Sequence, residues 1–235
     1  MNRESNKYTI IYAVIMVIIV ALGLSFTHQM LLERQVANEN IDKMQQILLS
    51  LNIVANVEEA EATYNKLIID AYLITTNGEK IEGTEGTAPE DPAFSTELGD
   101  PDEEGLPVYE GLIDGQRVYI LPMSGAGLWG SIWGYLAVEE NGSTIYGADF
   151  DHAGETPGLG AEIAQRSFGL QFEGKEIIKD GVFRSIAVVK PGQSDLRREY
   201  VDGISGGTIT SVGVSNMLTE SVGRYSEFLM NLNSN

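Results

Sequence analysis

The stretch Asp202-Gly203-Ile204-Ser205-Gly206-Gly207-Thr208-Ile209-Thr210-Ser211 organises the rest of this chain. It places two adjacent glycines and several hydroxyl side chains directly before a segment with helical periodicity. The apolar residues of that final segment are Val214, Met217, Leu218, Val222, Tyr225, Phe228, Leu229 and Leu232. Free N–H groups at a helix start favour an anion, and glycines let the backbone come close to it. The pattern predicts that Thr208 presents its hydroxyl beside a phosphate site; a glycine turn with an ordinary Ser/Thr N-cap is the alternative.

The composition limits the possible functions. The chain has 235 residues, 43% of them hydrophobic, which allows one domain of ordinary size plus appendages. Lys and Arg number 15 against 34 Asp and Glu, and the formal charge of -19 with no basic patch excludes nucleic-acid binding. There is no cysteine, so disulfides, thiolate-held iron–sulfur clusters and thiol catalysis are excluded too.

An apolar run near the N-terminus predicts a membrane anchor. Residues Tyr8–Phe26 carry no charge, and at helical rise they match the hydrocarbon thickness of a bilayer. A cleaved signal peptide would have a shorter apolar core followed by a small-x-small site. Here the run ends in Phe26-Thr27-His28 and continues into a helical pattern, so we expect a retained, single-pass anchor.

The flanking charges bear on the orientation of this anchor. Arg3 and Lys7 precede the span, while Arg34 and Lys43 follow it, so the positive charges nearly balance. The N-terminal amine tips the balance toward an N-terminus inside the cell, which leaves the C-terminal domain on the outer, periplasmic side.

The chain after the anchor divides into three predicted parts. After the anchor at residues 1–29, residues 30–70 form a helical stalk, with helices over Met30–Leu51 and Val57–Ile69. Residues 71–105 hold a hairpin signal around Thr76–Glu79 and an acidic loop over Gly83–Gly105. The carboxylates clustered in that loop, Asp100, Asp102, Glu103 and Glu104, lack the D-x-D-x-D-G pattern of a calcium loop, so we expect a solvated loop.

Residues 106–235 form the last predicted domain, which is mostly strands. Two hairpin turns, Asp114-Gly115 and Asn141-Gly142, separate runs of strand-forming residues. The strands are expected at Val108–Ile113, Val118–Leu121, Ser131–Val138, Thr144–Phe150 and Phe183–Val189, with a short helix at Ala161–Phe168. Antiparallel strands with flanking helices indicate an α+β fold.

Two kinds of site compete with a phosphate site. Asp202 and Ser205-Gly206-Gly207 faintly resemble the Asp-Ser-Gly-Gly of serine proteases, with His152 as a base, but the aspartate is three residues before the serine rather than adjacent. His152 also has Asp151 and Glu155 nearby, which could hold a divalent ion but equally suit an ordinary loop. The residues therefore predict no catalytic group and no metal.

A phosphate-bearing organic cofactor is the third option. The suitable residues are the glycines at 158, 160, 206 and 207, the hydroxyls of Thr156, Thr208 and Thr210, and Lys190. Neither the Rossmann G-x-G-x-x-G nor the P-loop pattern is present, so no dinucleotide or nucleotide-triphosphate site is implied.

Three stretches in order carry a family resemblance: Gly127–Tyr135 (GLWGSIWGY), Glu155–Glu162 (ETPGLGAE) and Asp202–Thr208 (DGISGGT). Together with the single anchor, they make the chain similar to the C subunit of the bacterial sodium-translocating NADH:quinone oxidoreductase, and less closely to the G subunit of the Rnf complex. The resemblance covers nearly the whole chain. It implies an FMN-binding domain and an electron carrier of a complex in the inner membrane, where other subunits oxidise NADH.

The resemblance also implies where the cofactor is attached. Members of this family carry FMN covalently, through a phosphoester to the threonine of a motif that Thr208 matches. A separate flavin transferase transfers the FMN moiety from FAD with a metal ion, and Asp202 would belong to its recognition motif. Gly207 stands where alanine is usual, which should leave room for the phosphate and loosen the turn.

The remaining site residues follow from their place in these motifs. Thr156, Leu159 and Gly160 would lie beside the flavin, with Leu159 as the apolar contact to the ring. The other expected cofactor-binding residues are Glu155, Lys190, Ser205, Gly206, Gly207 and Thr210. Trp129 and Trp133 have the flavin or the membrane face as alternatives, but burial in the core is expected for both. The rival interpretation is a non-catalytic, anchored binding module.

Overall fold

The computed structural model describes residues 6–96 and 105–234. Arg3 and the acidic cluster at residues 100–104 lie outside the described residues. The chain divides into two compact units, Met1–Asp42 and Lys43–Asn235.

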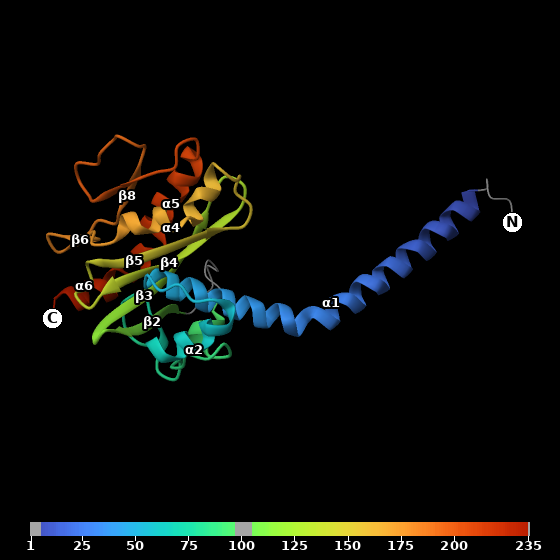
Figure 1. Cartoon of the computed structure of the whole chain (residues 1–235), viewed down its shortest axis with the longest axis horizontal. Helices are drawn as coiled ribbons and strands as arrows, with labels where there is room; N and C mark the ends of the chain where they lie inside the picture. The colour runs from blue at the N-terminus through green and yellow to red at the C-terminus, as the bar shows by residue number, and fades with distance from the viewer. Residues whose placement is uncertain (1–5, 97–104, 235) are drawn as a thin grey trace. The chain divides into compact units, whose positions relative to one another are not determined.

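Helix α1 runs unbroken from Asn6 to Ser50 (Figure 1). Within it, the most apolar 18-residue window has a mean hydropathy of 2.7, and none of that window is buried. Large apolar side chains such as Ile10, Ile15 and Met16 are exposed on different sides of the helix, which suits lipid rather than a protein core. The predicted continuation of the anchor into a stalk helix is confirmed, and the helix is long and apolar enough to cross a bilayer.

The end of α1 belongs to the second unit. Met44, Ile47 and Leu48 are buried there, in contrast to the exposed apolar residues nearer the N-terminus. The helix closes with a Schellman-type cap, in which Ile53 N–H donates to the Leu48 carbonyl at 2.9 Å. Asn52 takes the left-handed conformation that this cap requires, with φ of 62°.

Helix α2 spans Val57–Leu67, and strand β1 follows at once over Ile68–Ile74. The helix begins at Asn56, whose side chain accepts the N–H of Glu59 at 2.9 Å. The predicted hairpin partner of β1 is reduced to a single bridge between Ile74 and Lys80. Instead β1 pairs antiparallel with β2. The two strands lie on opposite sides of the predicted boundary at residue 105, so they belong to one sheet rather than to separate parts.

The domain is built on one antiparallel sheet with strand order β1-β2-β3-β4-β5, and Figure 1 labels β2 to β5 of this sheet. The remaining strands are β2 Leu106–Ile113, β3 Gln116–Ala126, β4 Ser131–Glu139 and β5 Ile145–His152. The two hairpins predicted at Asp114-Gly115 and Asn141-Gly142 are confirmed, as is the α+β fold.

Both faces of the sheet are covered. Side chains alternate between faces along a strand, so Val108 of β2 packs in the main core while the hydroxyl of Tyr109 donates to the Ala93 carbonyl at 2.9 Å. Ala93 lies in the short helix α3, Pro92–Ser95, where Phe94 is also buried. Part of the loop predicted to be solvated is therefore packed against the sheet.

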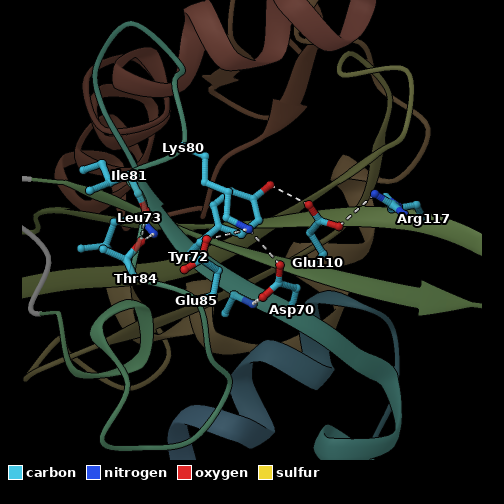
Figure 2. A network of polar contacts seen from close by, with 10 residues as sticks. Asp70, Tyr72, Leu73, Lys80, Ile81, Thr84, Glu85, Glu110 and Arg117 are labelled. Atoms are coloured by element: carbon cyan, nitrogen blue, oxygen red, sulfur yellow. Dashed lines mark hydrogen bonds and ion pairs between the residues drawn. The ribbon is translucent and has the colours of Figure 1, made fainter.

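A polar network covers the β1 edge of the sheet (Figure 2). The hydroxyl of Tyr72 donates to Glu110 Oε1 at 2.6 Å, and Arg117 pairs with Glu110 Oε2 at 3.1 Å. Lys80 lies 4.1 Å from the centre of the Tyr72 ring and pairs with Asp70 at 3.1 Å. The Lys80 contacts hold the turn after β1 against its own strand, whereas the other two contacts join β1, β2 and β3.

The rest of the chain consists of short elements, which cover the face of the sheet opposite α3. They are η1 Gly160–Ala164, α4 Arg166–Gly169, η2 Leu170–Phe172, β6 Ile178–Lys179, β7 Val182–Phe183, β8 Ala187–Val189, β9 Tyr200–Asp202, α5 Thr208–Glu220, η3 Val222–Tyr225 and α6 Ser226–Asn233. The strand predicted over Phe183–Val189 is split, because Ser185 has a φ of 59° that no strand residue adopts. The single final helix predicted from the apolar stripe is broken into α5, η3 and α6, although its stripe from Val214 to Leu229 is buried as expected.

Candidate functional site

Thr208 is the first residue of α5. The N-cap is Gly207, and no side chain caps the helix, so the alternative of a Ser/Thr N-cap is wrong. The Thr208 side chain is exposed and lines a pocket of about 440 Å³ together with Lys190. The other residues lining this pocket are Val188, Val189, Pro191, Gln193, Gly203, Ile204, Ser205, Gly206, Ser211 and Val212.

Hydrogen bonds fix the turn that leads to Thr208. Gly203 N–H donates to the Val189 carbonyl at 2.7 Å, which extends the parallel pairing of β8 with β9. Ile204 N–H donates to Ser211 Oγ at 2.9 Å, so the first turn of α5 closes the loop that precedes it. The sequence pattern does not single out this role of Ser211, although the position ends the stretch Asp202–Ser211 that organises the chain.

The start of the motif is held by Gln171 of η2. Its Nε2 donates to the Asp202 carbonyl at 3.2 Å, and its Oε1 accepts the Asp202 N–H at 3.0 Å. The amide therefore pairs with both main-chain groups of Asp202, as a neighbouring strand would. No local signal identifies Gln171, because it lies 31 residues away in the chain.

The adjacent glycines of the motif are needed for different reasons. Gly206 has a φ of 79°, and a Cβ there would lie 2.7 Å from Leu159 Cδ2, so Leu159 packs directly over this turn. At Gly207 a Cβ would lie 3.1 Å from Ile204 Cβ and 3.2 Å from Gly160 N. The glycine at 207 thus allows a tighter turn than alanine would.

Glu155 connects the first two motif stretches to the first turn of α5, directly after the third. It is only 5% exposed, its Oε1 accepts Trp129 N–H at 2.9 Å and its Oε2 accepts the Thr210 hydroxyl at 2.6 Å. Burial acts to raise the pKa of Glu155, but the bonds from Thr210 and from the N–H groups of Trp129 and Leu128 hold it below its usual range. The carboxylate is therefore ionised at neutral pH.

The predicted cofactor-binding residues fall into two groups. Thr156, Leu159, Lys190, Ser205, Gly206 and Thr208 are exposed, whereas Glu155, Gly160, Gly207 and Thr210 are buried. Ser205 and Ile204 also line a second, more open pocket of about 530 Å³, shared with Gly158 and Gln171. The fold thus brings the ETPGLG loop and the DGISGGT turn together.

The two tryptophans lie differently from the expectation. Trp129 is 68% exposed, so its predicted burial in the core is wrong. Its main-chain N–H donates to Glu155 at the turn between β3 and β4. Trp133 is half-buried.

Beside Thr208, Ile209 and Val212 are 58% and 50% exposed, so the first turns of α5 present apolar side chains to solvent.

The residues of the two rival sites have other partners. His152 Nδ1 accepts the Glu155 N–H at 3.2 Å, and Asp151 Oδ2 accepts a bond from Gln46 at 3.2 Å. In the part of the chain that the structure describes, no three His, Asp or Glu side chains gather as metal ligands would.

The chain is similar to known proteins over most of its length. The model of the FMN-binding domain family matches residues 127–223. The C subunit of the Na(+)-translocating NADH-quinone reductase of Vibrio anguillarum is 30% identical over 91% of this chain and 89% of that protein. Its counterpart from Haemophilus ducreyi is 28% identical over 92% of this chain and 89% of its own length.

Two solved structures are similar to this one. The crystal structure of the C subunit of the Na(+)-translocating NADH-quinone reductase from Parabacteroides distasonis is 51% identical, with a TM-score of 0.77, over 83% of this chain and 94% of that chain. The crystal structure of Shewanella oneidensis NqrC has a TM-score of 0.68 at 23% identity over 84% of this chain and 100% of that chain, and shows the shared fold.

Proposed function

This chain belongs to the NqrC family, the C subunits of the Na(+)-translocating NADH-quinone reductases, and from that premise we propose that it is a membrane-anchored electron carrier with FMN esterified to Thr208. The observation that carries the proposal is the position of Thr208. An exposed hydroxyl at the start of a 13-residue helix shares a pocket of about 440 Å³ with Lys190.

The residues at this site fit FMN. A phosphodiester on Thr208 would keep one negative charge, which the N–H groups at the start of α5 and the Lys190 ammonium would stabilise. Leu159, which lies over Gly206, offers an apolar surface for a flat ring, and Thr156 supplies an exposed hydroxyl in the same loop. FMN, when bound, supplies reversible uptake and release of electrons, while this chain supplies its position.

The role of Thr208 is attachment rather than acid–base catalysis. A threonine hydroxyl is a poor nucleophile, so we infer a separate flavin transferase that neutralises the phosphoryl charge with a metal ion. We propose that this enzyme recognises Asp202, because the residue is exposed and Gln171 holds its main chain. Permanent attachment prevents loss of the cofactor where no FMN pool can replace it.

The partners of this carrier are the other subunits of the membrane complex. Relatives named as the C subunit of the sodium-translocating enzyme favour this complex over an Rnf assembly. NADH oxidation and sodium transport are assigned to the assembly, and the anchor between Tyr8 and Phe26 contains no ionisable group suited to carry an ion.

The mass of the intact protein tests the attachment. Full-length chain made with a flavin transferase should gain one esterified FMN, and Thr208→Ala should remove it. Thr219→Ala is the matched control, because it deletes a hydroxyl at the other end of the same helix. Flavin that stays on denatured Thr208→Ala protein would overturn the assignment, and so would a wild-type mass without FMN.

We place the C-terminal domain outside the cytoplasm, and proteolysis of spheroplasts tests this orientation. Added protease should reach residues 30–235 in intact spheroplasts. Digestion only after lysis would reverse the orientation and leave the flavin assignment unaffected.

A further inference from the structure

One carboxylate joins the segments that surround Thr208. Trp129 lies in the turn between β3 and β4, and Thr210 lies in the first turn of α5. Glu155 accepts a hydrogen bond from each, through Oε1 and Oε2 respectively. A single side chain thus fastens the 127–130 turn and the 155–160 loop to the helix that Thr208 begins.

Two glycines have no side chain where the Glu155 carboxylate lies. A Cβ on Gly127 would clash with Glu155 Oε1, and a Cβ on Gly160 would clash with both Glu155 Oε2 and the Thr210 hydroxyl. Neither glycine has a positive φ, so backbone freedom does not explain them. Close approach to Glu155 does explain them.

The charge of Glu155 is held in place by its partners. Both oxygens are engaged by groups of the protein, and the residue is 5% exposed, so the side chain serves the scaffold rather than a ligand. A buried negative charge near a redox group makes the addition of an electron less favourable, because the interaction is poorly screened.

We propose that Glu155 is a positioning residue for the flavin, which locks the tryptophan turn and the ETPGLG loop onto α5 and places a fixed negative charge beside the cofactor. This inference rests on the proposed function. It reassigns Glu155 and Thr210 from cofactor-binding residues to residues that act through the loops they connect.

Paired substitutions separate the effect of the Glu155 hydrogen bonds on the loops from the effect of its negative charge on the flavin. Thr210→Val removes the hydroxyl at nearly constant volume, whereas Thr210→Ser keeps it. Glu155→Gln keeps an acceptor for Trp129 N–H and removes the charge. Glu220→Gln removes a charge from the exposed end of the same helix and serves as the control.

The measurements use the full FMN-loaded chain. Thr210→Val should speed hydrogen exchange at the Trp129 amide by about tenfold and lower the fluorescence anisotropy of the bound flavin, whereas Thr210→Ser should match the wild type. Glu155→Gln should shift the flavin midpoint potential to a more positive value, whereas Glu220→Gln should not. Equal hydrogen exchange and equal anisotropy in the two Thr210 variants would overturn the claim that Glu155 holds the loops on α5. Equal flavin midpoint potentials in the two glutamine variants would overturn the claim that the Glu155 charge acts on the flavin.

Failure of this inference is distinct from failure of the proposed function. If the wild-type mass shows no FMN, the function fails, but exchange at the Trp129 amide still decides whether Glu155 locks the loops. If Thr210→Val does not fold, hydrogen exchange at the Trp129 amide is compared between Glu155→Ala and Glu155→Gln. Exchange should be faster in the alanine variant, since only glutamine preserves an acceptor, and equal rates would overturn the claim that Glu155 holds the loops.

Discussion

Trp133 Nε1 donates a 3.0 Å hydrogen bond to Gln46 Oε1, which ties the last turns of α1 to strand β4. The other end of the same amide donates to Asp151 Oδ2 at 3.2 Å, and Asp151 is the cross-strand partner of Trp133 on β5. One glutamine therefore spans a strand pair and fixes the last turns of α1 on the sheet.

A double-mutant cycle measures this connection. Gln46→Ala and Trp133→Phe should each lower the free energy of unfolding by about 1 kcal/mol, because each leaves a part-buried polar group without its partner. The double variant should lose less than the sum, with a coupling of about 0.5–1 kcal/mol in denaturant unfolding of the domain. Additive losses would show that the bond contributes nothing to stability.

The cap of α1 gives a second test at Asn52. Its φ of 62° suits Asn or Gly, and its Nδ2 donates to the Tyr146 carbonyl at 3.2 Å. Asn52→Gly should cost less than about 0.5 kcal/mol, while Asn52→Ala, which strains the backbone as well, should cost about 1–2 kcal/mol. Thermal melting compares the two variants, and a glycine variant less stable than the alanine variant would contradict the cap.

Two glycines of one loop should respond in opposite ways. Gly160→Ala forces a methyl group into the Glu155 carboxylate and should destabilise the domain by about 2–3 kcal/mol. Gly154→Ala meets open space at an allowed backbone conformation, so it should be neutral or stabilising by up to about 1 kcal/mol. Chemical denaturation of both variants gives the comparison, and equal losses would show that the space around residue 160 is not closed.

The pH dependence of stability should report on Asp149. Burial and the neighbouring Asp151 raise the pKa of Asp149 to about 7, against opposing effects of Phe150 N–H and Arg166. The unfolded chain releases this proton near pH 4, whereas the folded protein retains it until about pH 7. The folded state therefore binds more protons in this window, so stability falls as the pH rises from 4 to 7.

Asp149→Asn removes this titration. The variant should match the wild type near pH 4 and exceed it by about 1–3 kcal/mol at pH 8, measured by denaturant unfolding across that range. A stability difference that does not change between pH 4 and pH 8 would show that the pKa of Asp149 is not raised.

Local patterns sufficed for much of the fold. The uncharged run from Tyr8 to Phe26, the turns at Asp114-Gly115 and Asn141-Gly142, and the apolar stripe after Thr208 depend on short-range periodicity and turn chemistry, which the sequence displays directly. The partner of β1 was not predicted, because a strand's pairing depends on distant residues, and Lys80 lay closer in sequence than β2.

The sequence by itself determined that Thr208 stands at the start of a helix after a glycine turn, since backbone freedom and helical spacing are local properties. Only the tertiary structure decided what surrounds it: Gln171 on Asp202, Leu159 over Gly206, and Glu155 between Trp129 and Thr210. It also decided that Trp129 faces solvent. These contacts join residues far apart in the chain, and their geometry is set by the packing of loops and helices against the sheet rather than by any local preference.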